Sequence, residues 1–290
     1  MGEPVFSDHR TADLAVVIPS YNSVRTLPHC LNALLAQNPI PREIIVVDSS
    51  PVFPVETYRQ QYPSVRFIHL GDESSAGRER NIGAAASSAP VIAFLDADCI
   101  VSPDWTRAVM EVLRRHPEQG VFVGALRNGN PQHIFGWLSF LSEFSGYIGR
   151  PKRRRVACLP SFCLVIRQEV FVAAGGFPED VWPGEDTVLS RRLLQQGHML
   201  VIEPTVRVAH INRTRYRDFL RHQFRLGQSF AMSRQRMSHL PGGKYYTRSA
   251  GYLPLMAAYR SLLTMARLLR DYPEGLLLFI LLFPAYVPGL

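Results

Sequence analysis

The sequence predicts an α/β fold with a mainly parallel sheet and helices on both faces. Three observations support this prediction: short apolar runs alternate with helical patterns, some of these runs end in acids, and the 290 residues are 47% hydrophobic and 19% charged. Alternation of this kind is typical of parallel strands joined by helices. The composition suits one large globular domain, with or without an appendage.

The expected elements follow one another in strand and helix order. An apolar run at residues 15–18 is stopped by Pro19, and the leucines of residues 27–37 have helical spacing. The other expected strands are residues 43–48, 66–70 and 91–95, and the other expected helix is the small-residue-rich stretch 77–86. Neither GxGxxG after the first strand nor GxxxxGK(S/T) occurs, which excludes the usual dinucleotide fingerprint and the P-loop.

Two carboxylates one residue apart, Asp96 and Asp98, follow the apolar run 91–95. The run is short and preceded by Pro90, which favours a buried strand, so the acids are expected at its carboxyl edge. Ligands bind at that edge in open α/β sheets. Such acids can hold a hard divalent cation together with the oxygens of a substrate diphosphate. The alternative is an Asp-rich turn that closes the strand.

The net charge of +8 comes from the last third of the chain. Residues 1–200 carry 19 Lys+Arg and 20 Asp+Glu, whereas residues 201–290 carry 13 and 4. A basic segment suits nucleic acid, anionic lipid or a phosphorylated substrate, and composition alone does not choose among them. The four cysteines lack C-x-x-C spacing, which argues against a zinc site or disulfide scaffold and favours a reducing setting. The N-terminus up to Asp13 lacks the apolar core of a signal peptide, so export is not expected.

The C-terminal part of the sequence predicts membrane association. Residues 275–290 carry no charge, but these 16 residues fall short of the roughly 20 needed to span a bilayer. Before them, residues 252–270 form an arginine-rich amphipathic pattern that suits a surface with anionic lipids. The alternative is an amphipathic helix packed on the domain and followed by a buried tail.

Six ordered motifs resemble those of family 2 glycosyltransferases of the GT-A fold. The motifs are VVIPSYN at 16–22, IIVVDSS at 44–50, GRERNIG at 77–83, FLDAD at 94–98, GGF at 175–177 and GED at 184–186, followed by Glu203-Pro204 and residues 206–210. The resemblance covers roughly residues 13–230 and implies a Rossmann-like mixed sheet that binds a nucleotide sugar. It leaves a flexible N-terminus at 1–12 and a basic, amphipathic and apolar helical extension at 231–290.

The resemblance implies a nucleotide-binding role for the first two motifs. In similar enzymes the position of Asp48 contacts the nucleotide base, and Pro19, Tyr21 and Asn22 are further candidates for the nucleotide sugar. The usual acidic second residue after Asp48 is replaced by Ser49, so the loop is expected to differ. The alternative for Asp48 is a helix-capping residue.

The resemblance also implies a diphosphate and metal site. Arg80 and Asn81 lie near a helix start, where a guanidinium can clamp a phosphate or pair with the base; an exposed arginine without a ligand is the alternative. Asp98 is the expected direct ligand of Mg²⁺ or Mn²⁺, with Asp96 on the ribose or a metal-bound water and Ala97 between them. His210 matches a late histidine that can complete the metal shell, and a structural histidine is the alternative.

Asp186 is the residue expected to act as general base. Transfer with inversion needs one carboxylate on the acceptor side to take the hydroxyl proton. Glu185 is expected to hold the acceptor, or to exchange roles with Asp186. The alternative is that both acids only complement a helix N-terminus.

Two basic stretches complete the set of candidates. Residues 151–155 are expected to form a solvated loop, with contact to a diphosphate or a phosphorylated acceptor as the functional alternative. Arg217, Arg221 and Arg225 recur every four residues and therefore lie along one helix face. In similar membrane-associated enzymes such a helix lies near the diphosphate, and Arg221, His222 and Arg225 are the candidates for that contact.

The leading hypothesis is a metal-dependent inverting glycosyltransferase at the cytoplasmic face of the cell membrane. Its expected donor is a nucleoside diphosphate sugar, with UDP favoured, and its acceptor is a hydroxyl of a lipid-linked or cell-envelope glycan; no nucleic-acid partner is expected. One alternative is a degenerate fold that binds nucleotide or membrane. A nucleotidyltransferase is less favoured, because PSYN at 19–22 provides no Gly/Arg/Lys-rich triphosphate loop.

Overall fold

The computed structural model describes residues 11–148, 152–181, 183–236 and 253–287. The chain divides into two compact units. The first unit comprises Met1–Ala125, Pro151–Asp180 and Glu185–Ala209, and the second comprises Leu126–Arg150, Val181–Gly184 and His210–Leu290. The second unit thus takes in residues 126–150 as well as the C-terminal extension.

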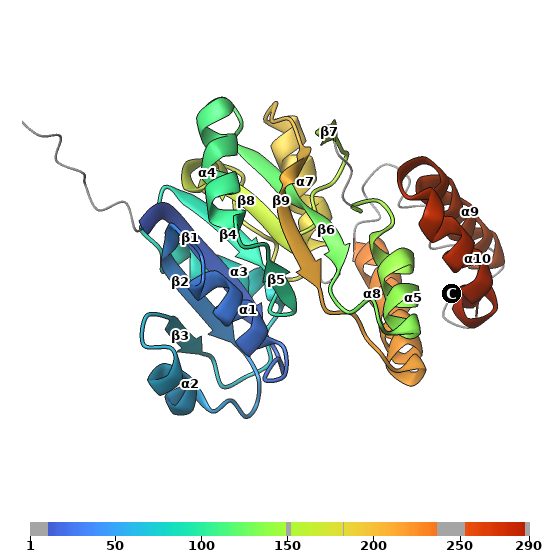
Figure 1. The fold of residues 1–290 in the computed structure, drawn as a ribbon, viewed down its shortest axis with the longest axis horizontal. Coiled ribbons are helices and arrows are strands. Elements are labelled where there is room, and N and C mark those ends of the chain that lie inside the picture. The colour runs from blue at the N-terminus through green and yellow to red at the C-terminus, as the bar shows by residue number, and fades with distance from the viewer. Residues whose placement is uncertain (1–10, 149–151, 182, 237–252, 288–290) are drawn as a thin grey trace, which may run out of the picture. The chain divides into compact units, whose positions relative to one another are not determined.

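In the described part of the chain, nine strands form one mixed sheet (Figure 1). The order is β3-β2-β1-β4-β8-β6-β9-β5, and β7 pairs with β9. The strands are β1 (Thr11–Ser20), β2 (Ile40–Asp48), β3 (Arg66–His69), β4 (Val91–Leu95), β5 (Cys99–Val101), β6 (Val121–Asn128), β7 (Arg154–Arg155), β8 (Cys163–Arg167) and β9 (Val201–His210). The predicted α/β fold is confirmed, and each of the four strands expected before residue 100 lies at its predicted place.

The first four strands of the chain form the parallel half of the sheet. β1 pairs in parallel with β2 and β4, and β2 pairs in parallel with β3. The central residues of β1, β2 and β4 are buried on both sides, as their continuous apolar runs predict. β8 then pairs antiparallel with both β4 and β6.

Helices cover both faces of this sheet. The helices of the first unit are α1 (Leu27–Leu35), α2 (Val55–Gln61), α3 (Ala76–Ala85), α4 (Trp105–Arg115), α6 (Gln168–Ala173) and α7 (Glu185–Gln195). Val17 and Phe94 are register partners, and they face Gly83 of α3 and Phe171 of α6. Cys163 pairs with Leu95 and meets Trp105 of α4 on the other face. One face therefore carries α3 and α6. The other carries α4 and α1, and Gln37, two residues after α1, accepts a hydrogen bond from Thr106 N of α4 at 3.0 Å.

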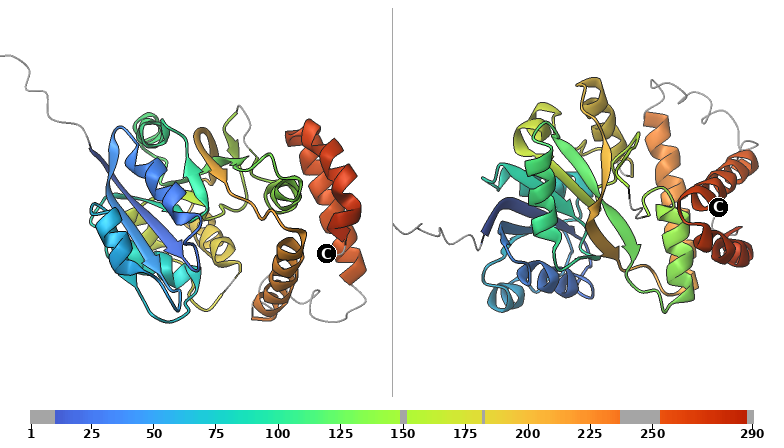
Figure 2. Two further views of the ribbon diagram at one scale, coloured as in Figure 1. Left: turned by 60° about the horizontal axis from the view of Figure 1, so that its bottom comes forward. Right: turned by 45° about the horizontal axis from the view of Figure 1, so that its top comes forward.

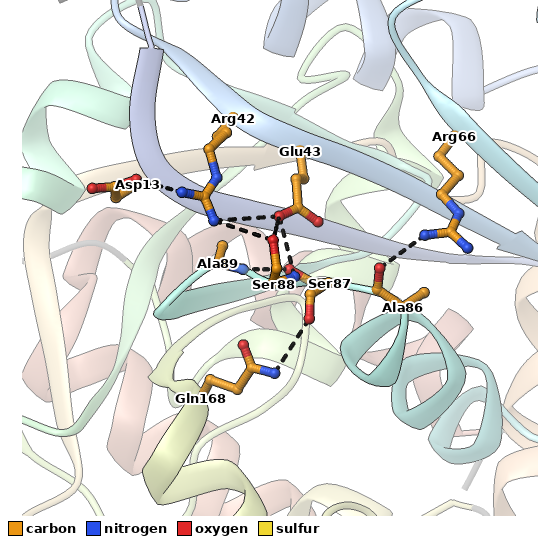
Figure 3. A network of polar contacts seen from close by, with 9 residues as sticks. All are labelled: Asp13, Arg42, Glu43, Arg66, Ala86, Ser87, Ser88, Ala89 and Gln168. Carbon is orange, nitrogen blue, oxygen red and sulfur yellow. Dashed lines mark hydrogen bonds and ion pairs between the residues drawn. The ribbon is translucent and has the colours of Figure 1, made fainter.

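A polar network closes the amino-terminal edge of the parallel half (Figure 3). Arg42 at the start of β2 donates to Asp13 at 2.9 Å and to Ser88 Oγ at 3.3 Å. Glu43 accepts from the Ser88 backbone N–H and hydroxyl at 3.2 and 3.0 Å. This network holds the turn between α3 and β4 in place. Ligands of open α/β sheets bind at the opposite edge, outside the carboxyl ends of the strands.

The described helices of the second unit are α5 (Ile134–Phe144), α8 (Tyr216–Arg236), α9 (Leu253–Asp271) and α10 (Pro273–Tyr286). Glu143 on α5 joins two residues of α8: its carboxylate lies 3.4 Å from His222 Nε2 and accepts from Gln223 at 3.0 Å. Burial raises the pKa of Glu143, but His222, Arg213 and His210 together lower it by more than burial raises it. The net pKa of Glu143 is therefore below the ordinary value. The expected helical extension is present, and α8 runs through residue 230. Among the described residues, no helix combines the length and apolarity that a membrane span needs.

Candidate active site

The carboxyl ends of the parallel strands gather polar residues along one edge of the first unit. Ser20 at the end of β1 pairs in register with Asp48 at the end of β2, and Asp48 pairs with His69 at the end of β3. Asp96 follows β4, the other neighbour of β1. The strand-end acids that the sequence predicted therefore lie at the edge where open α/β sheets bind ligands.

Asp48 is buried and held by several donors. Its Oδ2 accepts from Ser20 Oγ at 2.7 Å and from Ser50 Oγ at 3.0 Å, and its Oδ1 accepts from the Ser50 N–H at 2.9 Å. His69 Nδ1 lies 3.3 Å from Oδ1, and the His69 side chain is 24% exposed against 1% for Asp48. Asp48 therefore fixes the loop after β2 and does not cap a helix. Its contact with a nucleotide base stays a prediction.

The loop after β1 is tied to the same place. Asn22 has a positive φ of 54°, a conformation that Asn tolerates better than most residues. Its N–H donates to Ser50 Oγ at 2.8 Å, so the first and second motifs are joined. Pro19 is buried and Tyr21 is 43% exposed. Tyr21 and Asn22 are therefore the exposed residues among these candidates.

Glu79 is a buried acid of this region that sequence reasoning missed. It is 2% exposed, and its Oε1 accepts from Ser49 Oγ at 2.5 Å. Burial raises the pKa of Glu79 to about 7, although the Ser49 hydrogen bond and Arg80 lower it. Ser49 stands where similar enzymes carry an acid, so α3 supplies a carboxylate that the loop lacks. In the sequence, only the serine at position 49, where similar enzymes carry an acid, indicated that another residue supplies this carboxylate.

Arg80 connects two of the predicted acids. Its side chain is buried, and its two terminal nitrogens donate to Asp96 Oδ1 at 2.8 Å and to Glu185 Oε1 at 2.9 Å. Its guanidinium carbon lies 5.4 Å from the centre of the Phe177 ring, a cation–π contact. Burial alone would lower the pKa of Arg80, but the charges of Asp96 and Glu185 raise it. The alternative of an exposed, unpartnered arginine is excluded.

Asn81 and Gly176 hold the segment after α6 in place. The Asn81 side chain donates to Phe177 O at 2.9 Å and accepts from Phe177 N at 2.9 Å. Gly176 has a φ of 65°, and a Cβ on it would lie 2.8 Å from Asn81 Oδ1, so only glycine suits this position. Asn81 thus positions Phe177 beneath Arg80; its predicted contact with the nucleotide sugar is not tested by this geometry.

Asp96, Ala97 and Asp98 form the turn between β4 and β5. The Cys99 N–H donates to Asp96 O at 2.9 Å, so the acids close the strand in a tight turn, as one of the two sequence interpretations proposed. Ala97 is buried, while the Asp96 side chain is 31% exposed and Asp98 is half-buried. A turn does not exclude ligand binding, because it presents both carboxylates at the edge of the sheet.

This donor set fits a hard divalent cation. Two half-buried carboxylates one residue apart offer the oxygen ligands that Mg²⁺ and Mn²⁺ prefer, with substrate phosphates supplying others. Among the residues that the structure describes, no three His, Cys, Asp or Glu side chains are gathered as a metal site. Within the first unit, Asp96 and Asp98 are the residues that could hold the ion.

Glu185 and Asp186 begin α7 and differ in their surroundings. Glu185 is buried against Arg80, whereas Asp186 is half-buried and receives a hydrogen bond from Thr187 Oγ1 at 3.4 Å. Burial and the neighbouring charge of Glu185 raise the pKa of Asp186 to about 6, and Arg80 opposes this shift. A carboxyl group with this pKa is ionised at neutral pH and still able to take a proton. Both acids also lie in the first turn of a helix, where negative charge is favourable.

The remaining sequence candidates lie in the second unit. The His210 ring is buried, its Nδ1 lies 3.0 Å from Asn212 Oδ1, and its centre is 4.7 Å from that of Phe144. Arg221 and Arg225 are exposed on α8, and Arg221 pairs with Asp218 at 3.2 Å. His222 instead meets Glu143. Contacts of Arg221, Arg225 and His210 with a diphosphate or metal stay predictions.

The basic stretch 151–155 differs from its prediction in part. A solvated loop was expected, but Arg154 and Arg155 form β7 on β9, and Arg153 Nε lies 2.5 Å from Oε1 of the buried Glu203. Arg153 also donates to Gln119 Oε1 at 2.6 Å. The buried carboxylate explains the difference, because an ionised group in the interior needs a charged partner.

Comparison with known proteins assigns this site to a family. The family model described as "Glycosyl transferase family 2" matches residues 15–173, which contain the strand-end acids and Arg80. The chain belongs to glycosyl transferase family 2. This family member is 28% identical over 238 residues to the pre-mycofactocin glycosyltransferase of Mycobacterium tuberculosis, a match that covers 79% of this chain and 48% of the relative. The chain thus spans about half the length of that curated relative.

Solved structures of other glycosyltransferases share its fold. The mannosyltransferase PcManGT from Pyrobaculum calidifontis, in complex with GDP-Man and Mn²⁺, has a TM-score of 0.57 and 17% identity, covering 94% of this family 2 chain and 75% of its own. TarS 1–349 of S. aureus, in complex with UDP-GlcNAc, has a TM-score of 0.56 and 14% identity, covering 95% and 88%. At these identities the likeness shows the fold, which is GT-A, as the sequence motifs implied.

Proposed function

We propose that this chain transfers a sugar from a nucleoside diphosphate sugar to a hydroxyl acceptor with inversion. The observation that carries the proposal is the array of Asp96, Arg80, Glu185 and Asp186, in which one buried guanidinium joins the strand-end acid to the start of α7. Arg80 thereby holds the donor-side carboxylate of Asp96 and the acceptor-side carboxylate of Glu185 in a fixed arrangement. Membership of glycosyl transferase family 2 supports the reaction class.

On the donor side, Asp98 and Asp96 would hold Mg²⁺ or Mn²⁺. When bound, the ion offsets the negative charge of the departing nucleoside diphosphate. Arg80 keeps Asp96 in place, and the Asp48, Ser50 and Asn22 loop forms the floor on which the nucleoside would rest. The complexes of similar folds with GDP-Man and Mn²⁺ and with UDP-GlcNAc support a nucleotide sugar as donor. We propose a UDP-sugar first, and the complex of TarS 1–349 with UDP-GlcNAc supports this choice.

On the acceptor side, Asp186 acts as general base. The acceptor oxygen forms a bond to the anomeric carbon while its proton passes to the Asp186 carboxylate. The bond between that carbon and the diphosphate oxygen breaks, and its electron pair leaves with the diphosphate. Glu185 is paired with Arg80 at 2.9 Å, whereas Asp186 is half-buried and has the raised pKa, so Asp186 is the acid of this pair that is available for the proton. We further propose a lipid-linked or cell-envelope glycan as acceptor, at the cytoplasmic face of the membrane.

The test compares Asp186→Asn with Asp104→Asn, an acid-to-amide change at the exposed start of α4. Asp186→Asn should lower kcat about 100- to 10,000-fold, a range typical of losing a general base, with donor affinity unchanged. Asp104→Asn should leave both unchanged. In the wild type, kcat should fall as the pH drops below about 6, because protonation removes the base. Near wild-type turnover by Asp186→Asn would move the base elsewhere.

A further inference from the structure

α9 exposes large apolar side chains on one side and buries two polar side chains together with Leu268 on the other. Tyr259, Leu262 and Leu269 are about two-thirds exposed, at 65%, 66% and 65%. The opposite side of the helix carries Ser261 and Thr264, which are 5% and 3% exposed. A surface helix normally buries its apolar residues and exposes its polar ones. This helix therefore has a surface suited to apolar surroundings.

α10 also exposes large apolar side chains, and its buried side is apolar too, with Phe279 fully buried. Leu277, Ile280 and Leu281 are 69%, 49% and 76% exposed, and their spacing places them on one helix face. Tyr286, the last residue of the helix, carries a hydroxyl and is fully buried. Figures 1 and 2 show α9 and α10, drawn in red, packed side by side as a hairpin. We call the six exposed side chains, Tyr259, Leu262, Leu269, Leu277, Ile280 and Leu281, the apolar rows of the hairpin.

We infer that the apolar rows of the hairpin dock on the acyl and headgroup boundary of an anionic lipid bilayer. Exposed apolar rows of this extent mark an interaction surface. The charge of the hairpin favours lipid over a second protein: its described residues include Arg260, Arg267 and Arg270, and Arg270 is 63% exposed beside the rows. Asp271, which pairs with Arg270 at 2.6 Å, is buried, and Glu274 is the acid exposed on the hairpin.

The dimensions of the hairpin indicate how it would bind. α10 has 14 residues, too few to cross a bilayer at 1.5 Å per residue. A helix with one apolar side and arginines at its margin lies in the plane of the interface. Tyr259 suits that position, because its ring is apolar and its hydroxyl can remain at the headgroups. The surface is a property of the hairpin and does not depend on the proposed sugar transfer.

Vesicle flotation tests this inference with the full chain and no sugar donor. Wild-type protein should float with vesicles of phosphatidylcholine and phosphatidylglycerol, and less with phosphatidylcholine alone. Leu277→Gln combined with Leu281→Gln should weaken binding about tenfold or more, because the two changes remove apolar side chains that would enter the lipid. The matched control is Val172→Gln, a site of the first unit that is 68% exposed. Arg270→Gln should lower binding to the anionic vesicles only.

Circular dichroism checks that the double variant keeps its helices, and Leu262→Gln with Leu269→Gln replaces it if it does not. Equal flotation of wild type, hairpin variants and control would overturn the inference. So would a wild type that ignores both vesicle types and forms a dimer that the hairpin variants dissolve, since the rows would then be a protein interface. A wild-type protein that binds the vesicles but shows no transferase activity would count against the proposed function and not against this inference.

Discussion

Arg80 is the residue on which the candidate active site depends, because its guanidinium holds a strand-end acid and a helix-start acid at once. Asp96 and Glu185 lie 89 positions apart in the sequence, yet each is within 2.9 Å of a nitrogen of this buried side chain. Burial and the neighbouring charge of Glu185 raise the pKa of Asp186 to about 6. Two adjacent carboxylates thus receive different roles from their surroundings.

Glu79 provides a prediction at the same scale. Its pKa rises from an ordinary 4.5 to about 7 on folding, so its stabilising contribution is fully present below pH 4.5 and is lost as the pH rises through about 7. Glu79→Gln removes this pH-dependent loss of stability, because glutamine does not ionise. Its amide can still form a hydrogen bond with Ser49. Thermal unfolding from pH 5 to 8 should therefore show the Tm of the variant rising relative to wild type as the pH increases.

Ser49→Ala is the matched partner for that measurement. It removes the hydrogen bond at 2.5 Å that lowers the Glu79 pKa, so the Tm of Ser49→Ala should fall relative to wild type, most at high pH. A Tm difference between Glu79→Gln and wild type that stays constant with pH would contradict the raised pKa.

Sequence reasoning predicted some of these candidate residues. It named Asp96, Arg80, Glu185 and Asp186, because strand ends and helix starts are local signals. It did not find Glu79 or the environment of Asp48, because a glutamate in a helix usually faces water and its burial depends on the packing of α3 against the loop after β2. Burial of this kind is a tertiary property.

At the scale of elements, α3 packs unusually close to the sheet. A Cβ on Gly83 would overlap Val17 Cγ1 of β1, so the glycine permits the contact between helix and strand. This contact places Glu79 and Arg80, one turn earlier in α3, at the carboxyl-terminal edge. The small residues of the 77–86 stretch predicted a helix, and the structure adds the reason for them.

Gly83→Ala tests this close approach. The added methyl group should lower the free energy of unfolding by about 1–3 kcal/mol, the usual cost of overpacking, even though alanine favours helix. Val17→Ala introduced together with Gly83→Ala should recover part of the loss. Denaturant unfolding measures both.

The control for Gly83→Ala is Gly227→Ala in α8, where no atom lies within 4 Å of the added Cβ. It should leave stability unchanged or raise it by about 0.5–1 kcal/mol. If Gly83→Ala behaved like Gly227→Ala, the spacing between α3 and β1 would not be set by this glycine.

Sequence reasoning did not predict the elements between residues 99 and 173, among them α4, β6 and α5 of 11, 8 and 11 residues, and it also missed the short α2. β5, β7 and α2 are short, at 3, 2 and 7 residues, so their periodicity is too brief to recognise. The basic run that contains β7 looked like solvated loop, and only the buried Glu203 explains why it is ordered. The continuous apolar run of β4 was found at its observed bounds, residues 91–95.

At the scale of the whole molecule, the two compact units divide the chain differently from its sequence order. The second unit combines residues 126–150 with 210–290, because α5 packs with α8, α9 and α10. A boundary near residue 230 follows the shift in composition, whereas packing follows contacts between distant segments. The charge asymmetry is nevertheless a whole-chain property that sequence alone establishes, and the outward apolar rows of the hairpin could not be predicted without the fold.

The most direct test of the central claim is calorimetric titration of nucleotide sugars into the wild-type protein and Asp98→Asn, with and without Mn²⁺. The account predicts that wild type binds one UDP- or GDP-sugar at least tenfold more tightly with Mn²⁺, because the ion joins the aspartates to the diphosphate. Asp98→Asn should lose this metal dependence while keeping the fold. Donor binding that is equally tight without metal, or absent for every nucleotide sugar tried, would contradict the account.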